Sequence, residues 1–139
     1  MIKVYFWRIE RKKILWAIMR MALDRITLWR TSGISFWKLL GAGKGETFTP
    51  RDADPTRWGL LIVIEPDEIS NFEAGPLLRR WRANAISEYA VELSPISVHG
   101  EWSRKKPFAH LPHSPASWQG AVVAITRARI KWRKNLIFW

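Results

Sequence analysis

The chain contains no cysteine, and this absence removes several classes of site at once. Disulfide bonds, thiolate zinc sites and cysteine nucleophiles are excluded, and a reducing compartment is favoured. Long hydrophobic runs are also missing, since the longest, residues 59–64, is far too short to span a bilayer. The start of the sequence lacks the hydrophobic region and cleavage site of a secretory signal. We therefore expect a cytoplasmic protein that is soluble or peripheral to the membrane.

Neither common phosphate-binding motif is present, although three glycines alternate within the segment FWKLLGAGKGETFTP at residues 36–50. A P-loop requires Ser or Thr after its Gly-Lys pair, but Gly43 and Lys44 are followed by Gly45. The dinucleotide-binding motif requires a third glycine at the position of Glu46. Nucleotide binding is therefore disfavoured, and the glycines need another explanation.

Acidic residues are few, with 12 against 23 lysines and arginines, and the formal charge is +11. The chain also has ten tryptophans. Cationic surface attracts the phosphates of lipids or nucleic acids, and tryptophan prefers the membrane interface. These features predict a membrane surface as a partner. The alternative is that the tryptophans fill the core and the charges are only solvated. Nucleic acid is a disfavoured partner, because the aromatic motif of RNA-recognition sheets is absent.

The spacing of apolar residues predicts alternating strands and helices. Strands are expected at residues 4–9, 35–40, 57–65 and 90–97. A first helix is expected at 11–25, covered on more than one side, and a second from residue 67, broken near residues 75–76. The buried face of the second helix is expected to contain Leu77, Leu78, Trp81, Ala85 and Tyr89.

This order of elements is β-α-β-β-α-β, which predicts an α+β fold of the ferredoxin-like type. Its four-stranded antiparallel sheet has both helices on one face. The other face is then apolar and must contact a second domain, a second copy or a ligand. We expect this domain to span residues 1–100, followed by a loop or linker at 101–119. A strand and the start of a helix at 120–139 loosely repeat the beginning of the chain.

The segment at residues 36–50 also resembles the signature of the spheroidene monooxygenase (acyclic carotenoid 2-ketolase) family. The similarity continues through Pro66-Asp67, the run at 76–81, the run at 93–97 with Gly100 and Trp102, and the run at 124–128 with the terminal Phe138-Trp139. The first thirty residues match only as a strand followed by a helix. Members of the family contain two such halves, so the resemblance implies a partial sequence that ends just inside the second half.

The resemblance implies an oxygen-dependent monooxygenase that oxidises C-2 of acyclic carotenoids such as spheroidene to a ketone, in carotenoid biosynthesis. It implies O2 as co-substrate, an external electron donor, and haem as the expected cofactor. In the superfamily to which the resemblance points, two sheets pair face to face as a dimeric α/β barrel, so a homodimer is expected to complete the barrel. The superfamily also contains cofactor-free monooxygenases, which provide the alternative activity. A basic module that binds lipid or nucleic acid is the other alternative.

Candidate substrate- or cofactor-binding residues are concentrated in the segment at 36–50. Strand alternation places Lys38 on the opposite face from Trp37 and Leu39, where it could steer a carboxylate or be merely solvated. Three aromatic residues could line an apolar tunnel for a polyene or belong to the core: Phe36, Trp37 and Phe48. Three glycines could allow a ligand to approach the backbone or only form a strained turn: Gly41, Gly43 and Gly45.

The three histidines, His99, His110 and His113, are candidate iron ligands. His99 is the preferred candidate because it follows a predicted strand. Pro112 disfavours the helical turn that would let His110 and His113 share a metal. No catalytic triad or pair of catalytic carboxylates can be recognised from spacing, so the catalytic residues are not predicted.

Overall fold

The computed structural model describes residues 1–45, 52–115 and 117–125 of the 139-residue chain. The chain divides into two compact units, Met1–Ser94 and Pro95–Trp139. The second unit contains no helix or strand in the part that the structure describes. The expected strand at 120–130 is not formed over residues 120–125, and its remainder and the following helix lie outside the described residues.

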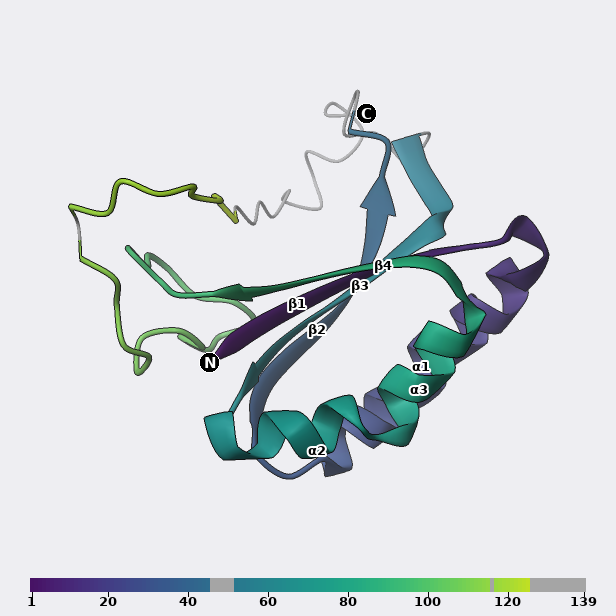
Figure 1. The fold of residues 1–139 in the computed structure, drawn as a ribbon, viewed down its shortest axis with the longest axis horizontal. Coiled ribbons are helices and arrows are strands. Elements are labelled where there is room, and N and C mark those ends of the chain that lie inside the picture. The colour runs from purple at the N-terminus through teal and green to yellow at the C-terminus, as the bar shows by residue number, and fades with distance from the viewer. Residues whose placement is uncertain (46–51, 116, 126–139) are drawn as a thin grey trace. The chain divides into compact units, whose positions relative to one another are not determined.

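The first unit contains a four-stranded antiparallel sheet with the order β2-β3-β1-β4. Its strands are β1 (Ile2–Ile9), β2 (Ile34–Gly43), β3 (Ala53–Ile64) and β4 (Ala85–Leu93). The helices lie together on one face of this sheet (Figure 1). The predicted ferredoxin-like fold is therefore confirmed.

The connections on the helical face are α1 (Ile14–Arg30), preceded by the short η1 (Arg11–Lys13), and a second helical segment made of η3 (Pro66–Glu68), α2 (Ile69–Glu73) and α3 (Pro76–Asn84). The predicted break between α2 and α3 is confirmed. Pro76 occupies the first turn of α3, where its missing N–H is not required.

Several boundaries differ from the sequence prediction. β2 ends at Gly43 instead of residue 40, β3 begins at Ala53 instead of residue 57, and β4 ends at Leu93 instead of residue 97. The first helix continues to Arg30 instead of ending near residue 25. The last strand begins at Ala85, so Ala85 and Tyr89 belong to β4 and not to the buried face of a helix. The backbone becomes extended at Ala85 because β4 pairs with β1, where Tyr89 lies opposite Phe6. Pairing between distant strands thus overrides a helical spacing that continued from Trp81.

The core lies between the sheet and the helices and is built around stacked aromatic rings. The Trp7 ring stacks on Tyr5 and on Trp81, with centroid separations of 5.8 and 5.0 Å. Trp16 of α1 meets the Trp81 ring edge-on at 5.1 Å. These contacts join β1, α1 and α3, and they show that several of the tryptophans are core residues.

The outer surface of α1 contradicts the expectation that this helix is covered on more than one side. Only Ala17, Asp24 and Leu28 of α1 are buried. Six large apolar side chains of the helix are instead exposed: Leu15, Ile18, Met19, Leu23, Ile26 and Trp29. None of the helices in residues 1–45, 52–115 and 117–125 combines the length and apolarity needed to span a bilayer.

Candidate functional site

The sheet face away from α1, α2 and α3 is the candidate binding surface, and we call it the distal sheet face. Alternation along β1 sends Tyr5 and Trp7 into the core and Phe6 to the distal sheet face. The strand register places Gly59 of β3 and Tyr89 of β4 on either side of Phe6. An aromatic row thus crosses two strands on this face, with a glycine beside it.

Gly59 gives the Phe6 ring the room to lie across β3. A Cβ atom added at Gly59 would be 2.9 Å from Cδ1 of Phe6, closer than carbon atoms normally approach. The residues Phe6 and Tyr89 are 40% and 61% exposed, respectively. Flat, accessible aromatic surface of this kind offers contact area to an extended apolar ligand.

Phe36 and Lys38 of β2 lie on the same face. Phe36 pairs with Val63 and Lys38 with Leu61, both neighbours of core-facing residues on β3. The Lys38 ammonium lies 5.2 Å from the centroid of the Phe36 ring, within the range of a cation–π contact. Lys38 is therefore not merely solvated, and the distal sheet face contains a cation beside the Phe36 ring.

Trp37 is separated from these residues by strand alternation. It packs against the core with Leu39, on the helical side of the sheet. The predicted opposition of Lys38 to Trp37 and Leu39 is confirmed. Of the sequence-derived candidates in this strand, the structure brings Phe36 and Lys38 together and leaves Trp37 on the other side.

The three candidate glycines occupy different surroundings. Gly41 lies at a register shift of β2, and the position of its absent Cβ is in open space. A Cβ at Gly43 would be 3.1 Å from the carbonyl oxygen of Asp52. Gly45 has a φ of +86°, which requires glycine for a turn. Gly43 and Gly45 thus have structural explanations, and Phe48 lies outside the described residues.

Phe6, Gly59 and Tyr89 are candidate site residues that the sequence did not reveal. The signal for Phe6 was present, because the three consecutive aromatics at residues 5–7 must point to both faces of a strand. Tyr89 was not recognised as a candidate because the sequence analysis assigned it to a helix. The role of Gly59 could not be predicted from the sequence, because only the strand register places this residue beside Phe6.

The histidines do not form a haem pocket in the part of the chain that the structure describes. His99, His110 and His113 are all exposed, and Nε2 of His99 is 2.8 Å from the Ser97 hydroxyl. Among the described residues, no group of three or more His, Asp or Glu side chains is placed to hold a metal ion. The described residues therefore include no chelating group for a metal ion, and their three histidines lie at the surface and do not enclose a haem.

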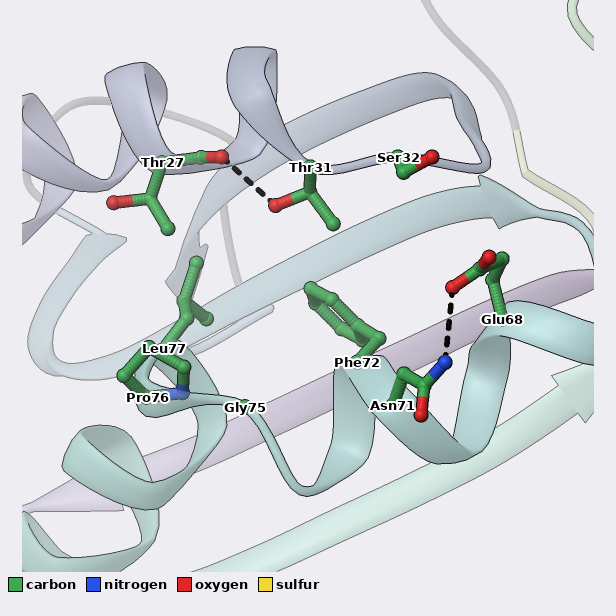
Figure 2. Close-up of a pocket in the computed structure, with 9 residues that line it drawn as sticks. All are labelled: Thr27, Thr31, Ser32, Glu68, Asn71, Phe72, Gly75, Pro76 and Leu77. Carbon is green, nitrogen blue, oxygen red and sulfur yellow. Dashed lines mark hydrogen bonds between the residues drawn. The ribbon is translucent and has the colours of Figure 1, made fainter.

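A small cavity lies between the end of α1 and the segment α2–α3 (Figure 2). Its volume is about 160 Å³, and its polar wall includes Thr27, Thr31, Glu68 and Asn71. The Thr31 hydroxyl donates to the Thr27 carbonyl, and the Asn71 amide donates to Glu68. Sites for drug-sized ligands are typically about 300 Å³ or more, so this cavity is too small for a long polyene.

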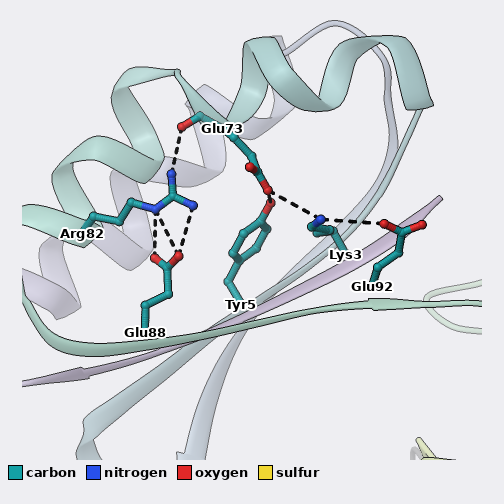
Figure 3. A network of polar contacts seen from close by, with 6 residues as sticks. All are labelled: Lys3, Tyr5, Glu73, Arg82, Glu88 and Glu92. Atoms are coloured by element: carbon teal, nitrogen blue, oxygen red, sulfur yellow. Dashed lines mark hydrogen bonds and ion pairs between the residues drawn. The ribbon is translucent and has the colours of Figure 1, made fainter.

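A polar network ties β1 to α2, α3 and β4 on the helical side (Figure 3). The Tyr5 hydroxyl donates to Oε1 of Glu73 at 2.9 Å, and Lys3 lies between Glu73 and Glu92. Arg82 donates to the Glu88 carboxylate at 3.1 Å. These groups are paired with one another, so we interpret the network as structural.

We expect Tyr5 to remain protonated at alkaline pH. Burial, followed by the hydrogen bond to Glu73, raises the pKa of Tyr5 far above its ordinary value. The chain has two tyrosines, so a Tyr89→Phe variant leaves Tyr5 as the only phenol. Its ultraviolet spectrum should show no phenolate up to about pH 11, where an ordinary tyrosine is largely ionised. A phenolate appearing near pH 10 in the folded protein would contradict the burial argument.

The same shift makes stability depend on pH with a definite sign. The folded state holds the Tyr5 proton more tightly than the unfolded chain does. This contribution is therefore fully present below the unfolded pKa of about 10 and is lost as the pH rises further. Urea midpoints of the Tyr89→Phe variant should fall above pH 10, and this fall should be smaller when Tyr5 is also replaced by phenylalanine.

Sequence comparison identifies relatives with one common name. The chain is 34% identical over 132 residues to the spheroidene monooxygenase of Cereibacter sphaeroides and 35% identical over 126 residues to that of Rhodobacter capsulatus. These matches cover 94% and 89% of this chain but 40% and 52% of the relatives. The chain thus spans about half the length of the curated relatives it matches, or less. The predicted resemblance is confirmed. A scan against models of known protein families found no match.

Solved structures show the same fold. An antibiotic biosynthesis monooxygenase aligns with a TM-score of 0.50 and 12% identity, over 68% of this chain and all of the other. A protein of unknown function from Nitrosomonas europaea, NE2512, aligns with a TM-score of 0.52 and 13% identity, over 72% and 94% of the two chains. At these identities the similarity establishes the fold alone.

Proposed function

We propose that this chain, a sequence relative of the spheroidene monooxygenases over nearly its whole length, takes part in the oxidation of acyclic carotenoids to ketones. The observation that supports this most directly is the identity of 34% over 132 residues. The ferredoxin-like fold and the aromatic distal sheet face agree with it. The proposed reaction is the oxidation of the C-2 methylene group of a carotenoid such as spheroidene.

The reaction consumes two molecules of O2 and four electrons. Each of two hydroxylations inserts one oxygen atom into a C–H bond at C-2, and a two-electron donor with two protons reduces the other oxygen atom to water. The resulting geminal diol loses water to leave the ketone. The electrons must come from an external donor, because none of the protein's side chains supplies four electrons per turnover.

The distal sheet face is the proposed substrate surface. Phe6 and Tyr89 supply accessible aromatic area, and the Lys38 ammonium lies beside the buried Phe36 ring, where it could hold a polar end group. A second ferredoxin-like sheet, from a homodimer, would cover this face and exclude water from the polyene. Since carotenoids dissolve in lipid, the protein is proposed to act at the cytoplasmic surface of a membrane.

Haem is the cofactor that the family resemblance implies. The described residues do not form its pocket, so no step of the reaction is assigned to it. A Soret band in the purified protein would show that haem binds to this chain. Turnover without that band would favour a cofactor-free monooxygenase.

The proposal is tested by producing the chain in a host that accumulates acyclic carotenoids. Mass spectra of the extracted pigment should show a product that has lost two hydrogens and gained one oxygen. Labelling with ¹⁸O2 should place the heavy atom in this ketone, provided that exchange with water is stopped by rapid extraction. Unchanged pigment in cells that contain folded protein would contradict the proposal.

Variants can then test the distal sheet face. Phe6→Ser should lower ketone formation about tenfold or more, because it removes the aromatic contact beside Gly59. Ile86→Ser is the matched control, since Ile86 is an exposed apolar residue of β4 on the opposite side from Tyr89. Equal losses in both variants would show that the distal sheet face has no special role.

A further inference from the structure

The outer surface of α1 is apolar although nothing in the first unit covers it. The six exposed residues Leu15, Ile18, Met19, Leu23, Ile26 and Trp29 form what we call the α1 stripe. Their spacing of three, four and seven residues places them on one side of the helix, within an arc of about 140° at 100° per residue. Among the large apolar residues that the structure describes, Trp29 is the most exposed, at 78%. The α1 stripe is therefore a continuous apolar surface along the helix.

The inner surface of α1 shows why the stripe faces outward. Asp24 is fully buried beneath the helix, where it accepts a hydrogen bond from Nε1 of Trp81 at 2.8 Å. Arg20 and Arg80 also donate to Asp24. These polar contacts fix the rotation of α1 on the sheet, because turning the stripe inward would expose Asp24 and separate it from its partners. The exposed stripe is thus a consequence of specific contacts.

The charges around the α1 stripe have one sign. Residues 11–30 contain six lysines and arginines and a single carboxylate, that of Asp24, which is buried. Arg25 borders the stripe on one side, and Arg30 lies at its C-terminal end. Neither has a carboxylate partner among the residues that the structure describes. Arg11 and Lys12 lie at the other end of the helix and are exposed, and Lys12 is paired with Glu10.

An apolar stripe bordered by Arg25 and Arg30, which have no carboxylate partner among the described residues, matches an anionic lipid surface. Apolar side chains enter the boundary between headgroups and acyl chains, and arginines contact the lipid phosphates. A second copy of this chain fits less well, because pairing two α1 helices would bring cations together with no exposed carboxylate on either helix to balance them.

We propose that α1 is the membrane-docking element of this protein and that it lies flat on an anionic bilayer with the α1 stripe inserted. The helix of 17 residues would lie along the surface for roughly 25 Å. Docking through α1 goes beyond the proposed reaction and does not depend on it. Vesicle binding is measured without carotenoid, so a failure of docking and a failure of ketone formation are distinguishable.

The test is co-sedimentation of the full chain with vesicles of phosphatidylcholine, with and without phosphatidylglycerol. We expect strong binding only when phosphatidylglycerol is present. Replacing two apolar residues, Ile18→Ser with Ile26→Ser, should lower the partition coefficient about tenfold or more. Replacing two cations, Arg25→Gln with Arg30→Gln, should lower it about twentyfold at low salt.

Matched controls lie outside α1. Ile86→Ser with Val122→Ser removes two exposed apolar residues, and Arg104→Gln with Lys106→Gln removes two exposed cations. Vesicle binding by both control variants should be within about twofold of that of the parent protein. This range allows for the small loss of net charge in the variant that lacks Arg104 and Lys106. Equal losses in the control and α1 variants would overturn the proposal. So would variants of the α1 stripe that bind vesicles normally but convert a dimer to a monomer in sedimentation velocity, because the stripe would then be a protein interface.

Discussion

Replacing Asp24 with asparagine is expected to lower the free energy of unfolding by about 3 kcal/mol. The Asp24 carboxylate has no exposed surface and receives the Trp81 N–H on one oxygen and the guanidinium groups of Arg20 and Arg80 on the other. An asparagine of the same shape removes the negative charge and presents an N–H group in place of one acceptor oxygen. In either orientation of the amide, its NH2 group faces a donor, either the Trp81 N–H or the two guanidinium groups, and the carboxylate that compensates the desolvation of the arginines is gone.

The size of this effect depends on how well water can reach the arginines. Arg20 is largely buried, whereas the side chain of Arg80 is 38% exposed and can be partly solvated after the substitution. We therefore expect the lower end of the range for a broken buried ion pair, about 3 to 5 kcal/mol. Urea denaturation measures the change as a lower midpoint with an unchanged slope.

The control for Asp24 is a carboxylate of the same chain that is paired but exposed. Glu10 contacts Lys12 at 2.8 Å on the surface, so Glu10→Gln should leave the midpoint unchanged within error. If Asp24→Asn changed the urea midpoint as little as Glu10→Gln, the contacts of Asp24 would not be what orients α1. The explanation for the exposed α1 stripe would then be wrong.

The order of the elements and the faces of β2 could be predicted because they depend on local periodicity. Alternation alone placed Lys38 opposite Trp37, and the register with β3 confirms it. The break before Pro76 followed from the missing N–H of proline. Each of these features is decided within a few residues, where sequence patterns are informative.

The rotation of α1 and the start of β4 could not be predicted, because contacts between distant residues decide them. Apolar residues occur around most of the circumference of α1, so periodicity does not identify its buried side. The choice is made by Asp24, whose partners Arg80 and Trp81 are 56 and 57 positions away. Likewise, the spacing from Trp81 to Ala85 and Tyr89 fits a helix, until pairing with β1 makes the chain extended.

Truncating Trp7 to alanine is expected to lower the free energy of unfolding by about 4 kcal/mol. Trp7 is 2% exposed, and its ring lies between Tyr5 and Trp81. Its indole N–H also donates to Glu88 at 2.6 Å, which ties β1 to β4. Alanine would leave a cavity at the centre of the aromatic stack and would leave the Glu88 carboxylate without this donor. Urea or thermal denaturation measures the loss.

A Trp7→Phe variant separates packing from hydrogen bonding. Phenylalanine keeps an aromatic ring between Tyr5 and Trp81 but cannot donate to Glu88, so about 1 to 2 kcal/mol should be lost. A loss as large as that of alanine would mean that the hydrogen bond, and not the aromatic stack, stabilises this part of the core.

The Trp7 variants also bear on the distal sheet face, because Phe6 precedes Trp7 in β1 and points to the opposite side. The Trp7 variants should lower ketone formation only by lowering the fraction of folded protein. The Phe6→Ser variant should lower ketone formation even when the protein is fully folded. We therefore expect the activity per folded molecule to be near that of the parent protein for Trp7→Phe and about tenfold lower for Phe6→Ser. The reverse order would place the substrate on the helical side of the sheet.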